Sequence, residues 1–324
     1  MAWWYTKTNI RNIGTKRVLF SFVTFMDDSV NPPSNRRVVA YNVFPFHHEM
    51  IGHVADFCIH RELQLVVYTN FEGHLGWMDL YVRLFEGIRF LPHTEYAYDS
   101  DDIVFLLTDD DPTFHPPTWT NVICIDHDRR VRRTEPRHRV ATRSYPDTPE
   151  LRPWVLPVYT MLWPTTRASG VACIGKFSWE WAKKTLQKYT NFGAFRIFVF
   201  DRRTNDGDYD DDDRTNVRFD ETATDMIQCL LHECQYIAVM APRYVNDLMS
   251  GAIPLAASTG CALLTTPMHA MTYGLQSCVD ATALTELLPL TEEHVAKVVE
   301  ETRGLIRRRN DAYDSLLTLV RSEN

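Results

Sequence analysis

The chain has 324 residues, a formal net charge of −8 at pH 7, 45% hydrophobic residues and 23% charged residues. Single hydrophobic cores stop growing at about 250–300 residues, so this length predicts two domains. The negative net charge excludes a general nucleic-acid coat, although a local basic face can still bind phosphate groups.

Cysteine usage and hydropathy indicate the cellular compartment. The seven cysteines are an odd number without a C-x-x-C pair, which predicts reduced thiols in an intracellular protein. The first residues, MAWWYTKTNIRNIGTKR, lack the continuous apolar segment of a signal peptide. No stretch reaches the about 18–20 apolar residues of a membrane-spanning helix. We therefore expect a soluble, cytoplasmic protein without a membrane partner.

Short apolar runs alternate with helical patterns through the first part of the chain. Continuous runs of Val, Ile, Leu and Phe between helices are typical of a parallel sheet that is covered on both faces. The expected strands are 17–25, 63–68, 88–91, 103–107 and 122–125, and the expected helices are 43–60 and 75–85.

Proline then interrupts the pattern six times between residues 136 and 164, which predicts a linker over 136–168. The alternation resumes after it and ends in a helical tail. The expected strands are 170–174, 194–200, 235–240 and 253–257, and the expected helices are 179–189, 222–234, 243–249 and about 291–320. We predict two doubly wound, Rossmann-like α/β domains, 1–150 and 151–324, with ligands at the carboxyl ends of their strands.

The segment FPFHHEMIGH, residues 44–53, has part of the pattern of a zinc-protease helix. That chemistry needs two histidines four residues apart, with a glutamate next to the first. Glu49 follows His48, but the next histidine is His53, five residues on, which turns the second imidazole away. An ordinary amphipathic helix is expected here.

Two acidic runs offer carboxylates for a metal ion. In LLTDDDP, residues 106–112, Asp109 and Asp111 have the D-x-D spacing that holds a divalent metal on a sugar-donor diphosphate. We favour a solvated turn that Pro112 closes, and a mobile surface loop for the run at 206–213. No metal site is predicted, although the acidic residues leave a divalent metal open.

The segment GVACIGKFSWEWAKK, residues 170–184, reads as a strand, a glycine and a helix. Gly175 lets the backbone approach a phosphate, and the helix start supplies unpaired N–H groups. Lys176 and Lys183 add positive charge. Many α/β turns share this pattern.

The segment QYIAVMAPRYVNDLMSGAIPLAAS, residues 235–258, is the most specific of the chain. Arg243 opens a helix at the expected carboxyl edge of the sheet, where an anion is well placed. Asn246 and Asp247 follow one turn later, within reach of ribose hydroxyls. The alternative is a helix cap with a surface arginine.

The strand, the basic residue that opens the next helix and the G-x-I-P pattern together resemble the donor site of GT-B glycosyltransferases. The resemblance implies two Rossmann-like domains that face each other across a cleft. The N-terminal domain would bind the acceptor and the C-terminal domain the nucleotide-sugar. The last helices of such proteins often return toward the N-terminal domain, which suits 291–320.

Within that class, RYVNDLMSGAI resembles the R-x-x-E-x-M-x-x-x-x-V segment of the T-even phage DNA β-glucosyltransferase type, an inverting enzyme that uses UDP-glucose. The resemblance gives Arg243 the diphosphate. Asn246 stands where that family has the ribose-binding glutamate, and Asp247 can substitute for it. The fucosyltransferase type is also similar here, but its T-E-K signature reads Ala241, Pro242 and Arg243.

The segment IGKFSWEWAKK resembles the Gly-x-Phe loop of the same phage family. The two arginines that follow in that family are Ser178 and Ala182 in this chain. Lys176 and Lys183 lie nearby, so a diphosphate clamp would be rebuilt from them.

The segment VICIDHDRRVRRTEPRHR, residues 122–139, is an apolar run tipped with aspartates. In the phage family a strand of the N-terminal domain ends in the catalytic base. Asp126 and Asp128 stand at that position, and Asp128 matches the family's D-x-R best. A carboxylate there would remove the proton of an acceptor hydroxyl as it attacks the sugar. Cationic groups such as Arg243 and Lys176 would offset the charge of the leaving diphosphate, so this arrangement requires no metal.

Positive charge follows those aspartates directly, at Arg129, Arg130, Arg132 and Arg133. These arginines bind the phosphates of a DNA acceptor in one interpretation, and the modified base would then be flipped out of the duplex. In the other interpretation they are solvated and pair with the acidic runs at 99–111 and 206–213.

The sequence thus favours a glycosyltransferase that moves a sugar from a nucleotide-sugar, UDP-hexose first, to an acceptor hydroxyl. A hydroxymethylated DNA base is the first acceptor and a glycan or glycoprotein the second. A nucleotide-sugar epimerase and a non-catalytic nucleic-acid-binding protein remain as alternatives.

Overall fold

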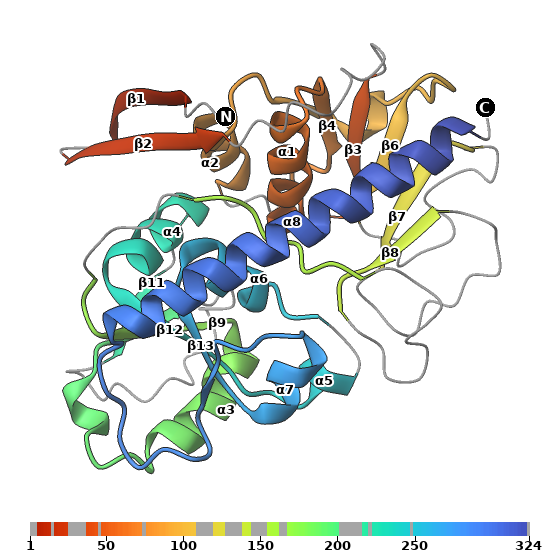
Figure 1. Cartoon of the computed structure of the whole chain (residues 1–324). Helices are drawn as coiled ribbons and strands as arrows, with labels where there is room; N and C mark the ends of the chain where they lie inside the picture. The colour runs from red at the N-terminus through yellow and green to blue at the C-terminus, as the bar shows by residue number, and fades with distance from the viewer. Residues whose placement is uncertain are drawn as a thin grey trace.

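The computed structural model of the chain describes residues 5–13, 16–24, 37–44, 47–72, 76–107, 119–126, 138–143, 154–161, 167–200, 216–219, 222–246 and 249–322. Its described part holds two six-stranded parallel sheets and one two-stranded antiparallel sheet (Figure 1). The antiparallel pair is β1 (Tyr5–Ile13) and β2 (Lys16–Thr24).

The N-terminal sheet has the order β5-β4-β3-β6-β7-β8, and all of its strands are parallel. Its strands are β3 (Val38–Asn42), β4 (Leu65–Thr69), β5 (Arg89–Pro92), β6 (Ile103–Leu106), β7 (Val122–Asp126) and β8 (His138–Ala141). The helical elements among them are η1 (His48–Met50), α1 (Ile51–His60), α2 (Trp77–Leu84) and η2 (His93–Glu95).

The C-terminal sheet has the order β11-β10-β9-β12-β13-β14 and is also parallel. Its strands are β9 (Gly170–Ile174), β10 (Ile197–Phe200), β11 (Asn216–Phe219), β12 (Cys234–Val239), β13 (Ala262–Thr265) and β14 (Val279–Asp280). The helical elements are α3 (Lys176–Leu186), η4 (Phe192–Ala194), α4 (Ala223–His232), α5 (Arg243–Asn246), α6 (Ala252–Thr259), α7 (Pro267–Thr272) and α8 (Glu292–Ser322).

Both sheets share one topology. In each, the first strand lies in the middle, the next two extend to one side, and the chain then returns to build the other side. This is the doubly wound order of Rossmann folds, so the predicted fold class is confirmed. The direction of the chain reverses between β3 and β6 in one sheet and between β9 and β12 in the other, and ligands bind at such switch points.

Some elements differ from the sequence-based prediction. The run 253–257, expected as a strand, lies in α6, and the strand follows it as β13. Every residue of α6 is buried, so the run shows no helical periodicity that could separate it from a buried strand. The expected linker 136–168 contains β8, the last strand of the N-terminal sheet. The expected division at residues 150 and 151 falls outside the described residues and stays a prediction.

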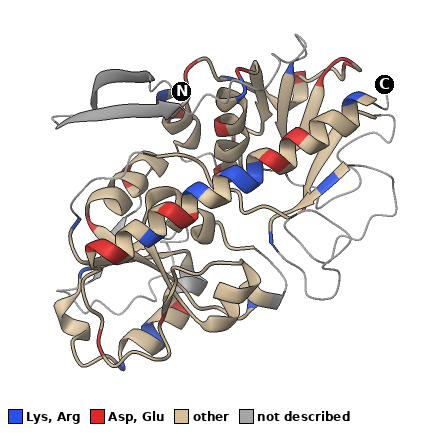
Figure 2. Cartoon of the chain, viewed as in Figure 1, with Lys and Arg blue, Asp and Glu red and all other residues tan. Residues whose placement is uncertain are grey.

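Helix α8 spans both halves of the molecule (Figure 1). Its earlier part packs on the C-terminal half, where Thr302 Oγ1 donates to Ala257 O at 3.1 Å. Its later part packs on α1, where Arg309 Nη2 donates to Asp56 Oδ2 at 2.8 Å. Figure 2 shows acidic and basic residues interspersed along this helix. The tail therefore returns to the N-terminal half, as the GT-B resemblance implied.

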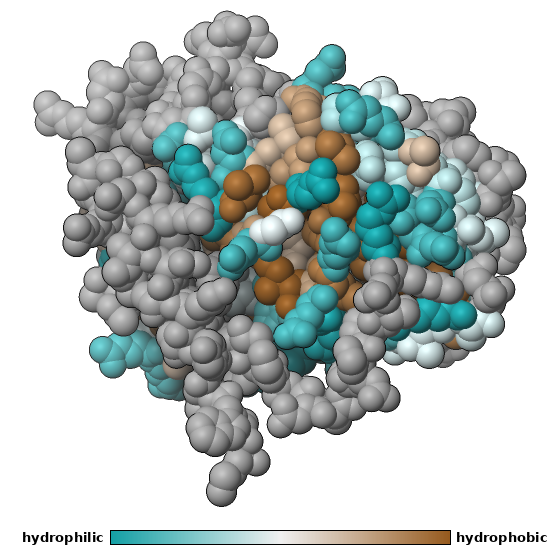
Figure 3. Space-filling model, turned by 90° about the horizontal axis from the view of Figure 1, so that it is seen from above, coloured by the Kyte–Doolittle hydropathy of each residue, from teal (hydrophilic) through white to brown (hydrophobic). Residues whose placement is uncertain are grey.

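The described helices contain no segment long and apolar enough to cross a membrane. Figure 3 shows the face of the molecule seen from above, where hydrophobic side chains gather in a central band that hydrophilic side chains border. Exposed apolar side chains of this kind are normal on folded proteins.

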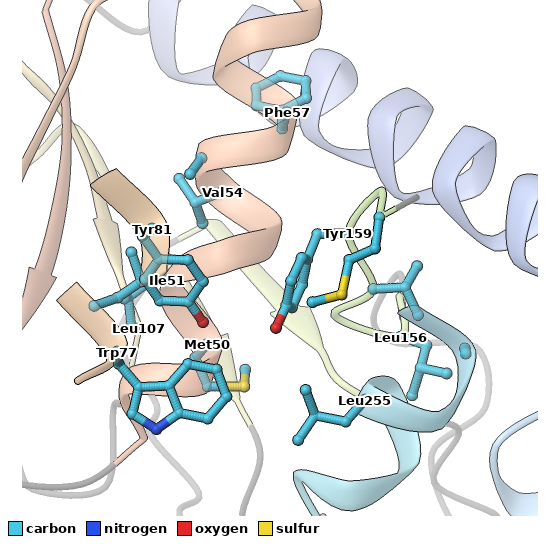
Figure 4. Close-up of a cluster of buried hydrophobic side chains, with 14 of the residues drawn as sticks. Met50, Ile51, Val54, Phe57, Trp77, Tyr81, Leu107, Leu156, Tyr159 and Leu255 are labelled. Carbon is cyan, nitrogen blue, oxygen red and sulfur yellow. The ribbon is translucent and has the colours of Figure 1, made fainter. Parts of the chain in front are cut away.

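A single hydrophobic cluster joins the two halves. It contains Met50 and Tyr81 from the N-terminal half, Leu255 from α6, and Tyr159 from the connecting segment (Figure 4). The rings of Tyr81 and Tyr159 meet edge to face with centroids 6.0 Å apart. Large apolar interfaces of this kind hold two domains in one relative orientation.

His53 of α1 contacts this cluster through Tyr313, with ring centroids 5.8 Å apart, and it should make the protein sensitive to acid. Its side chain is fully buried, and burial, together with the nearby charge of Arg309, lowers its pKa to about 3. The unfolded chain protonates this histidine near its ordinary pKa of 6.5, whereas the folded chain does not. The free energy of unfolding should therefore fall as the pH drops from 6.5 toward 3, by up to about 1.4 kcal/mol per pH unit.

Urea unfolding of wild type and His53→Leu over this pH window measures the effect. The slope should be shallower in His53→Leu, while His232→Leu, a change at an exposed histidine of α4, should keep the wild-type slope. Equal slopes in all three proteins would contradict the prediction.

Candidate functional site

The carboxyl ends of the two sheets face each other. Arg143, just past β8, donates from Nη1 to Tyr244 O at 2.9 Å and to Val245 O at 2.5 Å, both in α5. A Cβ atom added at Gly251, before α6, would lie 2.8 Å from Glu49 Oε1. Loops that follow β3 and β8 of one sheet therefore touch segments that follow β12 of the other. The candidate site lies between these loops, where doubly wound sheets bind ligands.

Gly175 lies at the switch point of the C-terminal sheet, directly after β9. Its backbone has φ 86° and ψ 150°, which favours glycine, and an added Cβ would meet no atom within 4 Å. Lys176 begins α3, but its side chain lies outside the described residues. Lys183 lies two turns further on, half-buried, with Nζ 5.9 Å from the centre of the Trp179 ring. The backbone at Gly175 is therefore open to a ligand, while Lys183 packs against its own helix.

Arg243 lies at the same edge, because it opens α5 after β12, the neighbour of β9 in the sheet. It is half-buried, and its guanidinium carbon lies 5.9 Å from the centre of the Tyr244 ring. Asn246 ends α5, but its side chain and the whole of Asp247 lie outside the described residues. The structure thus brings Gly175 and Arg243 to one switch point.

The α5 turn is fixed by buried polar groups of the C-terminal half. The Nε2 atom of His269 lies 3.0 Å from Ala241 O. Because a carbonyl oxygen can only accept, Nε2 carries the proton and donates it in this hydrogen bond. Burial lowers the pKa of His269, so the ring is neutral and Nδ1 accepts from the Thr266 hydroxyl at 2.7 Å. Tyr273 Oη donates to Tyr244 O at 2.6 Å. A turn of four residues is thereby held in one place.

Asp126 is the last residue of β7, at the carboxyl edge of the N-terminal sheet. Its side chain is buried, and its Oδ1 accepts from Arg139 Nη1 at 2.7 Å, inside a buried ion pair. This ion pair leaves Asp126 Oδ1 engaged with a cation of its own sheet. Asp128, Arg129, Arg130, Arg132 and Arg133 lie outside the described residues, as do the acidic runs at 108–112 and 206–213.

The loop after β3 contributes two residues that the sequence analysis did not select. His47 adopts the left-handed conformation, with φ 64° and ψ 23°, which is strained for a residue other than glycine. Its Nδ1 lies 3.4 Å from Glu49 Oε1, and 26% of its side chain is exposed. Such strain gathers at functional sites. The H-H-E sequence could have indicated this pair, but β3 was not predicted, so its place at a strand end was hidden.

His48, the neighbour of His47, has a different environment. Its side chain is fully buried, and its Nε2 donates to Asn70 O at 2.8 Å. Over the described ranges, no group of three or more His, Cys, Asp or Glu residues could hold a metal ion.

Comparisons with known proteins identify the fold. No protein-family model and no curated protein matches the sequence. The solved structure of AviGT4, a glycosyltransferase involved in avilamycin A biosynthesis, is similar with a TM-score of 0.54 at 11% identity, covering 87% of this chain and 98% of that one. The structure of Anabaena HepE with UDP and glucose is similar with a TM-score of 0.50 at 10% identity, covering 89% and 98%. The chain therefore has the GT-B fold, two Rossmann-like domains whose strand ends face each other.

Proposed function

We propose that the chain is a glycosyltransferase that moves a sugar from a nucleotide-sugar to an acceptor hydroxyl. The proposal rests on one observation: the carboxyl edges of the two sheets meet. Gly175 and Arg243 lie at the switch point of one sheet, and His47 with Glu49 follows the central strand of the other. The likeness of the fold to AviGT4, and to HepE with its UDP and glucose, supports it.

The carboxyl edge of the C-terminal sheet suits the donor. A diphosphate can approach the open backbone of Gly175 and the first N–H groups of α3. Arg243 supplies a guanidinium that can form charge-assisted hydrogen bonds to phosphate oxygens. We assign Lys176 to the same diphosphate and Asn246 or Asp247 to the ribose. UDP-hexose is the favoured donor, and HepE, solved with UDP and glucose, is in keeping with this choice.

The carboxyl edge of the N-terminal sheet suits the catalytic base. An acceptor hydroxyl attacks poorly until a group within hydrogen-bond reach removes its proton. Glu49 Oε1, 3.4 Å from Nδ1 of His47, favours a proton on that nitrogen and leaves Nε2 to accept one. We therefore propose His47 as the base and Glu49 as its orienting partner. Asp128 is the second candidate, and Asp126 is the weaker of the two aspartates because Arg139 already pairs with it.

The acceptor is proposed on the chemistry of the sequence. Arg129, Arg130, Arg132 and Arg133 follow the strand that Asp126 ends, and they suit a polyanionic acceptor such as DNA with hydroxymethylated bases. A glycan hydroxyl is the alternative. Developing charge on the leaving diphosphate is offset by Arg243, Lys176 and backbone N–H groups, so the proposed reaction requires no metal.

Release of nucleoside diphosphate tests the function. UDP-, GDP- and dTDP-sugars are each incubated with hydroxymethylpyrimidine DNA, unmodified DNA, a sugar acceptor or no acceptor. Release that depends on an acceptor supports a transferase, and the acceptor that triggers it identifies the substrate class. Conversion of the donor into a different nucleotide-sugar without any acceptor would indicate an epimerase instead. If no donor binds, the proposal is overturned.

Replacing Arg243 with alanine should weaken donor binding. Loss of charge-assisted hydrogen bonds to phosphate, worth about 1.5–3 kcal/mol, should raise the Kd for the nucleoside diphosphate about 10- to 150-fold. Isothermal titration calorimetry measures this change. Arg196→Ala is the matched control, because Arg196 is an exposed arginine of the same half that pairs with Glu233 at 2.9 Å. An unchanged Kd in Arg243→Ala would show that Arg243 does not hold the diphosphate.

A further inference from the structure

We infer that Arg143, a residue of the N-terminal half, positions the α5 turn and thereby sets the affinity of the donor site in the C-terminal half. The inference rests on the proposed function, because α5 carries Arg243. We place the effect of Arg143 in the main chain of Tyr244 and Val245, to which its Nη1 donates.

The α5 turn has little stability of its own. It contains four residues, and its backbone bonds join Tyr244 N to Ala241 O and Val245 N to Pro242 O, both at 3.0 Å. A single turn is costly to form without outside support. The carbonyl groups at the end of a helix have no partner inside it and need one elsewhere. Arg143 Nη1 reaches two of them, Tyr244 O at 2.9 Å and Val245 O at 2.5 Å.

Burial makes this contact specific. Only 1% of Arg143 is exposed, so its guanidinium has left water and depends on the partners that the fold supplies. Tyr273, fully buried, donates to the same Tyr244 O at 2.6 Å. His269 holds Ala241 O at the start of the turn. The turn is thus fastened from its own half by Tyr273 and His269 and from the opposite half by Arg143.

The arrangement ties donor binding to the relative position of the two sheets. Arg143 lies two residues past β8, the edge strand of the N-terminal sheet, and α5 directly follows the Ala241–Pro242 pair after β12. When a side chain that positions a ligand is displaced by about 1 Å, most of its contribution is lost. Loss of Arg143 should therefore let α5 shift and carry Arg243 away from the diphosphate.

Three variants test this positioning role. Arg143→Met removes both donations, Arg143→Lys keeps a charge that can reach one carbonyl, and Tyr273→Phe removes only the hydroxyl that donates to Tyr244 O. Arg61→Met is the matched control, since Arg61 also joins the halves, through Asp314 at 2.5 Å, but at the α1–α8 contact instead of α5. Each protein is titrated with UDP, GDP and dTDP, and its KM and kcat are measured with the sugar that wild type uses.

The three variants should weaken donor binding to different degrees. Arg143→Met should raise the Kd and the KM for the donor about tenfold or more, with a smaller change in kcat. Arg143→Lys should recover part of the affinity, and Tyr273→Phe should raise the Kd about 2- to 10-fold. Arg61→Met should bind the nucleotide as wild type does.

The outcomes separate the two proposals. If wild type binds none of the three nucleotides, the proposed function fails. If wild type binds and Arg143→Met binds equally well, the function stands and the positioning role is overturned. Equal weakening in Arg61→Met would also overturn it, because loosening of the halves would then explain the effect. If Arg143→Met does not fold, Arg143→Lys and Tyr273→Phe decide, and wild-type affinity in both would overturn the role.

Discussion

Replacing His47 with glutamine should lower kcat about 10²- to 10⁴-fold, the range that general base catalysis contributes. Glutamine keeps a polar side chain of similar reach but cannot take up a proton from the acceptor hydroxyl. The donor site lies on the other sheet, so the Kd for the nucleoside diphosphate should stay near that of wild type. Steady-state kinetics with saturating donor and acceptor, together with calorimetric titration of the nucleotide, measure both quantities.

His60→Gln is the control for His47→Gln. His60 is also a partly buried histidine beside a carboxylate, with Nδ1 3.6 Å from Asp56 Oδ1, but it lies at the far end of α1. It should keep wild-type kcat. Asp128→Asn serves as the rival test. If Asp128→Asn abolishes transfer while His47→Gln retains full kcat, the base is Asp128.

Replacing Arg309 with methionine should lower the free energy of unfolding by about 3–5 kcal/mol, the loss expected when one partner of a buried ion pair is removed. Arg309 is fully buried, and its guanidinium donates to Asp56 Oδ2 at 2.8 Å and to Val158 O at 2.6 Å. Methionine fills similar space but leaves the Asp56 carboxylate without this cation. Urea unfolding followed by circular dichroism measures the change.

Two further variants show whether the unpaired charge causes that loss. Arg309→Met combined with Asp56→Leu removes both charges and should recover part of the stability. Arg303→Met changes an exposed arginine of the same helix, 3.5 Å from Glu300, and should alter stability by less than about 1 kcal/mol. A small loss in Arg309→Met would show that the pair between α1 and α8 adds little.

Much of the fold could be predicted from the sequence because parallel strands buried on both faces form continuous apolar runs. The runs at 103–107, 122–125 and 170–174 became β6, β7 and β9 with only small shifts at their ends. Helix α6 was mistaken for a strand because a helix buried on every side has no polar face. Strand β3 was missed although strands of four and five residues were recognised elsewhere, because its run VVAYN continues without a break into the segment assigned to the helix 43–60.

The candidate site was only partly visible in the sequence. Gly175 and Arg243 carry local signals, because a glycine or an arginine at a strand–helix junction is recognisable from neighbouring residues alone. His47 and Glu49 depend on the place of β3 in its sheet, which sequence periodicity does not show. The role of Arg143 depends on its contact with Tyr244, 101 residues further along the chain, and no local sequence pattern indicates that contact.

The hydrophobic cluster shared by the two halves affects how the molecule can move. Tyr81, Tyr159 and Leu255 belong to one continuous core, so rotating one half against the other would expose apolar surface to water. We therefore expect little hinge-like closure of whole domains around a bound substrate. The same core should make unfolding cooperative across the chain, with a single calorimetric transition instead of one for each half.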